Sequence, residues 1–208
     1  MVPRRSIDHP SVVSRRRALA GVGTALAVSL AGCSALPSRT LDDPEREDQA
    51  SSAILNYYVD DERVAEVAMT ELWRTSHGDA YGDWQFPFRT NVWHGDDFTL
   101  ESLRYVFRPR GVDHPPEFYL QRPGGYPWEP IEFARGEDHE ETILEVPDLG
   151  FQGRGSVAFE LVAAVYDEEP FELEIDVAAT LGADGLTGRD YRIEGTLERT
   201  IPGRGGQA

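Results

Sequence analysis

Apolar and polar residues alternate along several segments in the second half of the chain. The segment FELEIDVAATL, residues 171–181, has an apolar side chain at every second position, and GSVAFELVAAVYD, residues 155–167, shows the same period. A period of two is typical of a β-strand that buries one face. The short connection DEEP between the two segments predicts that they pair as an antiparallel hairpin. Further strands are expected at 87–94, 98–109, 117–122, 130–135, 141–147 and 190–201.

The segment AILNYYVDDERVAEVAMTELWR, residues 53–74, fits two patterns. Leu55, Tyr57 and Val59 alternate with their neighbours as in a strand, whereas Val64 and the apolar residues after it also fit one face of a helix. We expect a hairpin that turns at residues 60–63, and we keep a helix from residue 60 to 73 as the alternative.

Short strands with frequent turns and no clear helix predict an all-β fold. We expect an antiparallel β-sandwich of seven to nine strands, formed by residues 53–202 and followed by a disordered tail, 203–208. Within it, EVPDLGFQGRGSVAFEL, residues 145–161, resembles the corner that precedes late strands in immunoglobulin-like modules of prokaryotic surface proteins. This resemblance implies that the sandwich is immunoglobulin-like.

The N-terminal segment has the layout of an export signal. The apolar run at residues 18–31 is shorter than the roughly 20 residues that a membrane-spanning helix needs, and it follows a cluster of arginines. Arg15 and Arg16 lie in SRRRAL, which resembles a twin-arginine signal. The run ends in LAGC, which resembles the lipobox of prokaryotic lipoproteins. These resemblances imply a signal peptide at residues 1–32 and a diacylglyceryl group on Cys33.

Cys33 is the only cysteine in the chain, so its lipidation leaves no thiol for a disulfide, a redox pair or a nucleophile. Residues 33–52 are polar and charged, without an apolar period, which predicts a flexible acidic tether between the lipid and the sandwich. Anchoring by two acyl chains is strong enough to hold a protein stably on a membrane.

The charge of the chain is strongly negative. The full sequence has a net charge of −17, and every basic residue is arginine. Residues 1–32 hold five of the 20 arginines and one of the 37 acidic residues, so the remainder carries 15 basic and 36 acidic side chains, a net charge of −21. Together with the export signal, this composition resembles that of twin-arginine-exported lipoproteins of haloarchaea. The resemblance implies a lipid-anchored protein on the outer face of the cell membrane.

Several classes of function are disfavoured by the sequence. The chain offers no basic cluster for nucleic acid after the signal, and it contains neither a G-x-S-x-G nucleophile motif nor a glycine-rich nucleotide loop. Acidic residues flank His94 and His139, but no HExxH motif occurs. We therefore predict no cofactor, no metal site and no catalytic residue.

Aromatic residues in glycine- and proline-rich segments are the candidates for ligand binding. Tyr81 and Trp84 lie in HGDAYGDWQFPF, and Tyr126 and Trp128 lie in GGYPWEP. Exposed rings can stack on sugars or anchor a protein partner. The alternative is that these rings cover the ends of the sandwich core.

The sequence thus predicts a cell-surface binding or structural module, held to the membrane by the lipid on Cys33 and contacting a surface glycan or protein. Two alternatives remain. One is a glycan hydrolase that uses a pair of loop carboxylates. The other is an accessory subunit of a membrane transporter or export complex.

Overall fold

A computed structural model describes residues 36–72, 84–121, 131–136, 138, 140–185 and 188–204, all within one compact unit, 33–208. The predicted signal peptide, 1–32, with Arg15 and Arg16, lies outside the described residues, as does Cys33. No helix in the part of the chain that the structure describes is long and apolar enough to cross a membrane.

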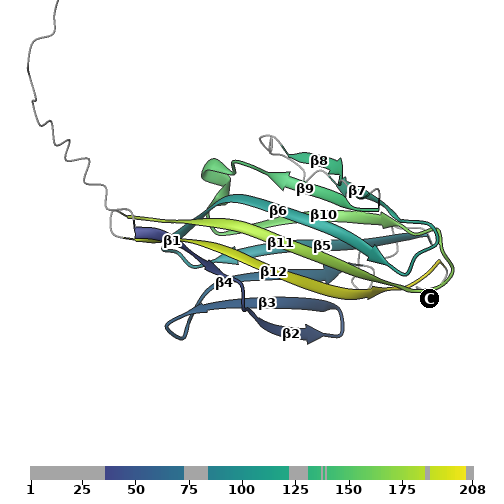
Figure 1. The fold of residues 1–208 in the computed structure, drawn as a ribbon, viewed down its shortest axis with the longest axis horizontal. Coiled ribbons are helices and arrows are strands. Elements are labelled where there is room, and N and C mark those ends of the chain that lie inside the picture. The colour runs from purple at the N-terminus through teal and green to yellow at the C-terminus, as the bar shows by residue number, and fades with distance from the viewer. Residues whose placement is uncertain are drawn as a thin grey trace, which may run out of the picture. The chain divides into compact units, whose positions relative to one another are not determined.

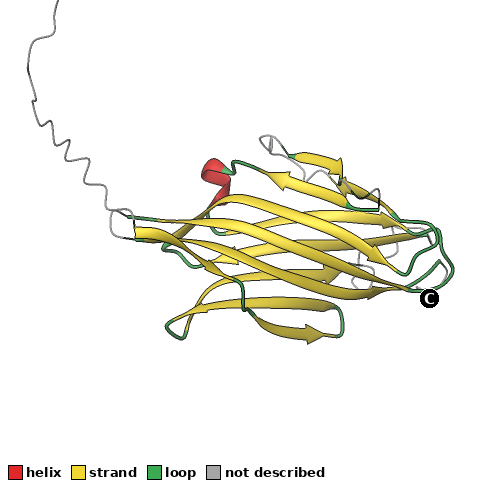
Figure 2. Ribbon diagram, in the orientation of Figure 1, coloured by secondary structure: helices red, strands yellow, loops and turns green. Residues whose placement is uncertain are grey.

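Two six-stranded sheets pack face to face (Figures 1 and 2). The order is β1-β12-β11-β6-β9-β8 in one sheet and β2-β3-β4-β5-β10-β7 in the other, and among the described pairs only β1 and β12 run parallel. The antiparallel β-sandwich is confirmed, with twelve strands in the described residues instead of seven to nine. The elements are β1 Leu36–Leu41, β2 Glu45–Gln49, β3 Ser52–Val59, β4 Glu62–Glu71, β5 Gln85–His94, β6 Phe98–Arg110, β7 Glu117–Gln121, β8 Glu132–Arg135, β9 Thr142–Val146, the 3-10 helix η2 Gly150–Gly153, β10 Ser156–Ala164, β11 Phe171–Ala183 and β12 Arg189–Ile201.

The hairpin expected at residues 60–63 is formed by β3 and β4. Asp60 and Asp61 link the strands with φ of 51° and 65°, and Val59 lies opposite Glu62. Two successive residues with positive φ define the tight turn whose twist matches a hairpin, and aspartate tolerates this conformation better than most residues. The helical alternative for this segment is therefore wrong.

The predicted hairpin between β10 and β11 is wrong. β10 pairs with β5 and β7 in one sheet, whereas β11 pairs with β6 and β12 in the other. Alternation identifies the face that a strand buries, but it does not identify the neighbouring strand, because two such strands can also meet face to face across the core. The connection between them, residues 165–170, crosses from one sheet to the other.

The flexible tether predicted at 33–52 is also wrong where the structure describes it. β1 pairs with β12, and β2 pairs with β3 over its whole length. All five residues of β2 are exposed. An edge strand with both faces in solvent is held by backbone hydrogen bonds and needs no apolar period, so the sequence pattern does not reveal it.

The sandwich also extends beyond residue 202 at its C-terminal end. Gly203 is buried, and a Cβ placed on it would lie 2.0 Å from the carbonyl oxygen of Glu168. The backbone N–H of Arg204 donates to the carbonyl oxygen of Asp167 at 2.8 Å. Residues 203 and 204 therefore belong to the ordered sandwich and not to the disordered tail predicted at 203–208, and residues 205–208 lie outside the described part.

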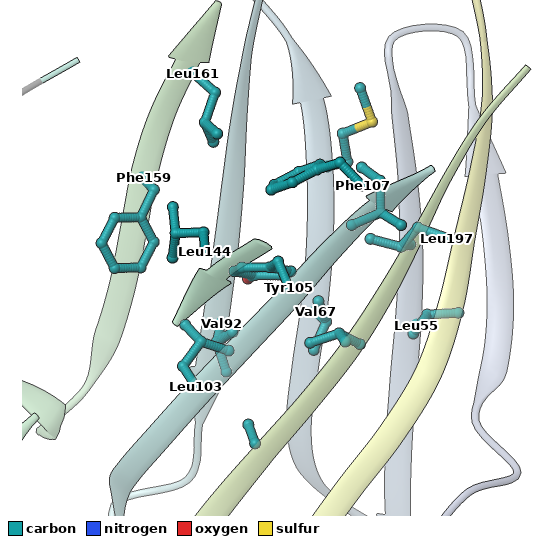
Figure 3. Close-up of a cluster of buried hydrophobic side chains, with 14 of the residues drawn as sticks. Leu55, Val67, Val92, Leu103, Tyr105, Phe107, Leu144, Phe159, Leu161 and Leu197 are labelled. Atoms are coloured by element: carbon teal, nitrogen blue, oxygen red, sulfur yellow. The ribbon is translucent and has the colours of Figure 1, made fainter. Parts of the chain in front are cut away.

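The core lies between the two sheets and is rich in large side chains (Figure 3). Tyr105 and Phe107 from β6 face Phe159 and Leu161 from β10, and all four are fully buried. The rings of Phe107 and Phe118 stack at 5.2 Å between centroids. Each large apolar side chain buried in this way stabilises the fold by about 1.5–3 kcal/mol. Packing of the two inward faces against each other therefore stabilises the sandwich.

The last strands of the two sheets lie along the same side of the sandwich. β7 ends one sheet order and β8 ends the other, and Figure 1 shows both along one edge, opposite the β2–β3 hairpin. This side carries most of the exposed aromatic residues of the described chain.

Candidate functional site: an aromatic strip beside an edge groove

Large apolar side chains are exposed at few described positions, and most of these lie near one another. Among the described residues, Tyr58 (41% exposed), Trp84 (42%), Tyr119 (51%), Phe133 (36%) and Tyr166 (46%) are the exposed large hydrophobic residues. Tyr58 belongs to β3. Tyr119 and Phe133 lie on the edge strands β7 and β8, Tyr166 follows β10 by two residues, and Trp84 directly precedes β5. Trp84 is joined to this group through its contact with Val165.

The carboxylate of Glu117 holds two of these rings. Tyr119 donates its hydroxyl to Glu117 Oε2 at 2.5 Å, and Tyr166 donates to the same oxygen at 3.2 Å. The pairing of β7 with β10 brings the three residues together, because Glu117 lies opposite Ala164, two residues before Tyr166. Each ring therefore has a fixed polar end while about half of its surface stays exposed.

Hydrogen bonding keeps Glu117 ionised and Tyr119 protonated. The Tyr119 hydroxyl, the Tyr166 hydroxyl and the nearby positive charge of Arg135 lower the pKa of Glu117 below its ordinary value. The same hydrogen bond raises the pKa of Tyr119, because losing the proton would place two negative charges in contact. The arrangement is thus stable across the neutral range.

Trp84 lies beside Tyr166. Its carbonyl oxygen accepts a hydrogen bond from the backbone N–H of Val165 at 2.7 Å. Trp84, Val165, Tyr166 and Arg204 line a shallow hollow of about 330 Å³. We refer to Trp84, Tyr166 and Tyr119 as the aromatic strip.

An open groove of about 540 Å³ lies next to the strip, between β7 and β8. Phe133 of β8 lies opposite the buried Leu144 of β9, so its side chain points toward the space between the sheets. We refer to this feature as the edge groove. Its lining residues are Pro115, Pro116, Glu117, Phe118, Tyr119, Phe133, Ala134, Arg135, Glu140 and Thr142.

The lowered pKa of Glu117 makes this residue unsuited to act as a general acid. Glu117 and Glu140 both line the edge groove, as a carboxylate pair of a hydrolase would. A general acid, however, needs a raised pKa, whereas the tyrosine hydroxyls lower the pKa of Glu117. Fixed rings next to a charged, ionised carboxylate are better suited to holding a ligand than to transferring a proton to it.

The structure describes one of the four predicted ligand-binding residues. Trp84 is exposed, which opposes the alternative that it covers the core. Tyr81, Tyr126 and Trp128 lie outside the described residues. Sequence reasoning missed Tyr119 and Tyr166, although a signal existed: each occupies the outward position of an alternating segment, where a polar residue is usual.

The histidines with acidic neighbours have structural contacts where they are described. His94 is 2% exposed, with Nδ1 2.9 Å from the carbonyl oxygen of Gly95 and Nε2 2.7 Å from that of Gly153. It therefore links the end of β5 to η2. His139 lies outside the described part. Over the ranges that the structure describes, no three His, Cys, Asp or Glu side chains are grouped so that they could hold a metal ion.

Several solved structures have a similar chain path. A collagen-binding domain from a Staphylococcus aureus adhesin shares 6% identity, covering 55% of this chain and 89% of its own, with a TM-score of 0.34. The collagen-binding subdomain of the Enterococcus faecalis surface protein ACE shares 9% identity, covering 58% and 91%, with a TM-score of 0.32. A cohesin module of a Clostridium perfringens family 33 glycoside hydrolase shares 12% identity, covering 57% and 86%, with a TM-score of 0.35. Likenesses of this size carry no functional argument.

No functionally curated protein matches the sequence. One family does match, over residues 38–203, a range that includes most of β1, all of β2 and the first two residues after β12. This range agrees with the sandwich as the structure describes it and begins well before the boundary expected at residue 53. The chain therefore belongs to the family described as "Domain of unknown function (DUF8121)".

Proposed function

We propose that this protein is a binding module on the outer face of the cell membrane, anchored by lipid on Cys33, which captures a surface glycan or protein through the aromatic strip. The observation that carries the proposal is the pair of exposed tyrosine rings, Tyr119 and Tyr166, that donate to one oxygen of Glu117. Rings fixed before binding lose little rotamer entropy when a ligand covers them, and they present large apolar faces for stacking.

The anchor is supported by the sequence LAGC, which ends the export signal at Cys33. Because β1 begins at Leu36, three peptide steps separate the lipidated residue from the first strand. Three steps span at most about 11 Å, so the sandwich would be held next to the bilayer instead of on a long tether. The ligand would then be one that lies close to the membrane surface.

Binding to isolated cell-envelope material tests the proposal. The full chain, made with Cys33→Ser to prevent lipidation, is immobilised and its retention of envelope glycans and envelope proteins is measured. We expect Tyr119→Ala together with Tyr166→Ala to weaken retention at least about tenfold, because central aromatic side chains dominate binding energy. The matched control is Tyr58→Ala, since Tyr58 is exposed to a similar degree but belongs to β3. Equal retention by the double variant and the control would refute the proposal.

A further inference from the structure

His114 is an exposed histidine whose orientation is fixed by Asp167. Its Nδ1 lies 2.7 Å from Asp167 Oδ1, and the backbone N–H groups of Asp113 and His114 donate to Oδ2 at 2.8 and 3.0 Å. The side chain of Asp167 is 16% exposed, whereas that of His114 is 74% exposed. Pro115 and Pro116 follow directly, and their rings restrict the backbone. The imidazole is therefore held through one nitrogen, which leaves the other, Nε2, open to a ligand.

His114 and Asp167 lie next to the aromatic strip. Asp167 directly follows Tyr166 in the chain, and His114 precedes Glu117 by three residues. The same two segments are joined a second time where the Tyr166 hydroxyl donates to Glu117 Oε2. Pro115, the residue after His114, lines the edge groove. His114 and Glu117 therefore supply polar groups to the surface that carries Tyr166.

The contact with Asp167 determines what Nε2 of His114 can bind. The backbone N–H and the side chain of His114, with the backbone N–H of Asp113, lower the pKa of Asp167, and the ionised carboxylate can only accept hydrogen bonds. The proton of the shared hydrogen bond therefore belongs to Nδ1. Nε2 then accepts a hydrogen bond when the ring is neutral and donates one when the ring is protonated. A sugar hydroxyl fits Nε2 in both states, because it can donate and accept.

The charges beside the strip favour an uncharged ligand. A carboxylate offers about four lone-pair positions, so Glu117 can accept further hydrogen bonds besides those of the two tyrosine hydroxyls. Glu140 and Arg135 also line the edge groove, and Arg204 lines the hollow beside Trp84. The chain after residue 32 carries a net charge of −21, which repels anions. A ligand rich in hydrogen-bond donors and free of negative charge suits this surface.

Building on the proposed binding role of the aromatic strip, we propose that its ligand is an uncharged glycan and that His114 Nε2 contacts one of the sugar hydroxyls. The apolar C–H face of a sugar can stack on the exposed tyrosine rings, while the hydroxyls around it reach Glu117 and His114. An acidic glycan would bring its own anions against Glu117. A peptide presents separate N–H donors and C=O acceptors, so each of its groups suits only one state of Nε2.

Binding of three envelope fractions to the immobilised full-length Cys33→Ser protein tests the proposal. Released envelope glycans are separated by anion exchange into a neutral and an acidic fraction, and deglycosylated envelope proteins form the third fraction. Binding is measured in molar KCl, where a Debye length of about 3 Å screens long-range repulsion, so that a preference reflects direct contacts. We expect the neutral glycans to bind at least about tenfold more tightly than either other fraction.

The variant His114→Asn separates the ligand contact from the contact with Asp167. The side-chain amide of asparagine can donate to Asp167 in place of Nδ1, but it has no group at the position of Nε2. We expect a nearly unchanged melting temperature and at least about fivefold weaker binding of neutral glycans, the value of one hydrogen bond. Asp96→Asn is the matched control, because Asp96 is exposed and lies between β5 and β6.

Three results would overturn the inference. Equal or tighter binding of the acidic glycans or of the proteins would assign the strip to another class of ligand and leave the proposed binding role intact. Unchanged affinity of a folded His114→Asn variant for neutral glycans would show that His114 only fixes its loop. Binding of no fraction would refute the binding role itself, and this inference with it. The comparison of fractions uses the unaltered strip, so it does not depend on how the variant folds.

Discussion

Arg199 on β12 and Glu71 on β4 form an ion pair that joins the two sheets, with 2.6 Å between Nε and Oε1. The side chains are 17% and 3% exposed. The same guanidinium donates to the carbonyl oxygens of Gln49 and Ala50, in the turn between β2 and β3. One arginine thus attaches the turn after the polar strand β2 to the opposite sheet, which helps to explain why a strand with no apolar period is ordered.

Replacing Arg199 should strongly destabilise the fold. Arg199→Leu removes one half of an almost buried ion pair, and breaking such a pair costs about 3–5 kcal/mol. Equilibrium unfolding in denaturant measures the change. The control is Arg192→Leu, whose partner Glu194 is 42% exposed, so that its loss should cost less than about 1 kcal/mol. A similar decrease in the free energy of unfolding of both variants would show that the Arg199–Glu71 pair stabilises the fold no more than an exposed ion pair does.

Acid should weaken the connection between β10 and β11 through Asp167. The backbone N–H and the side chain of His114, with the backbone N–H of Asp113, lower the pKa of Asp167 below its ordinary value. A lowered pKa in the folded state stabilises the fold above the ordinary value of about 3.9, and this contribution is lost as the pH falls through the folded value.

We therefore expect Asp167→Asn to lower the melting temperature at neutral pH, with a difference from wild type that shrinks below about pH 4. Melting temperature against pH is the measurement, and Asp96→Asn serves as a control at an exposed position. If the difference in melting temperature between wild type and Asp167→Asn stayed constant from pH 7 to pH 3, the lowered pKa of Asp167 would not be the cause of the stabilisation.

Salt should stabilise the protein. With a net charge of −21 after residue 32, mutual repulsion of surface carboxylates opposes the compact state, and added salt screens that repulsion. We expect the melting temperature to rise from dilute buffer to molar KCl. An unchanged melting temperature over this range would show that the ion pairs of the surface already balance the repulsion.

The alternation of apolar and polar residues predicts which face of a strand is buried, but it does not predict which strand lies next to it. The alternation in β11 and β12 reports a buried face, and both strands were correctly expected. Alternation does not identify the neighbouring strand. The sequence therefore predicts a pairing of β10 with β11, whereas the structure places them in different sheets. β2 has no buried face at all. In addition to its backbone pairing with β3, Arg46 links it to β12 by donating to Glu198 at 2.8 Å across 152 residues of sequence. Long-range contacts of this kind leave no local pattern.

The candidate site was predictable only in part for a related reason. Trp84 was identified because a tryptophan among glycine and proline stands out in the sequence. Tyr119 and Tyr166 each occupy an outward position of an alternating segment, but this position alone does not bring them together. The two rings meet only because β7 pairs with β10 and places both beside Glu117. The arrangement of these rings depends on that strand pairing.

Replacing Cys33 should release the protein from the membrane. If the lipid is the only anchor, Cys33→Ser should shift the protein from the membrane fraction to the medium or leave it unprocessed, because the acyl chains supply the membrane affinity. Fractionation of cells with detection of the protein is the measurement. A wild-type protein that is wholly soluble, with an unmodified Cys33, would contradict the anchoring proposal.

The central claim is that the aromatic strip binds a ligand and does not support the core, and Trp84→Ala tests it most directly. Thermal unfolding and the binding isotherm for cell-envelope material are measured on the same preparation. Because Trp84 is 42% exposed, we predict a loss of stability well below the roughly 3–5 kcal/mol that a buried tryptophan costs, together with at least about tenfold weaker binding. Unchanged binding with a loss of about 3 kcal/mol or more in stability would contradict the account.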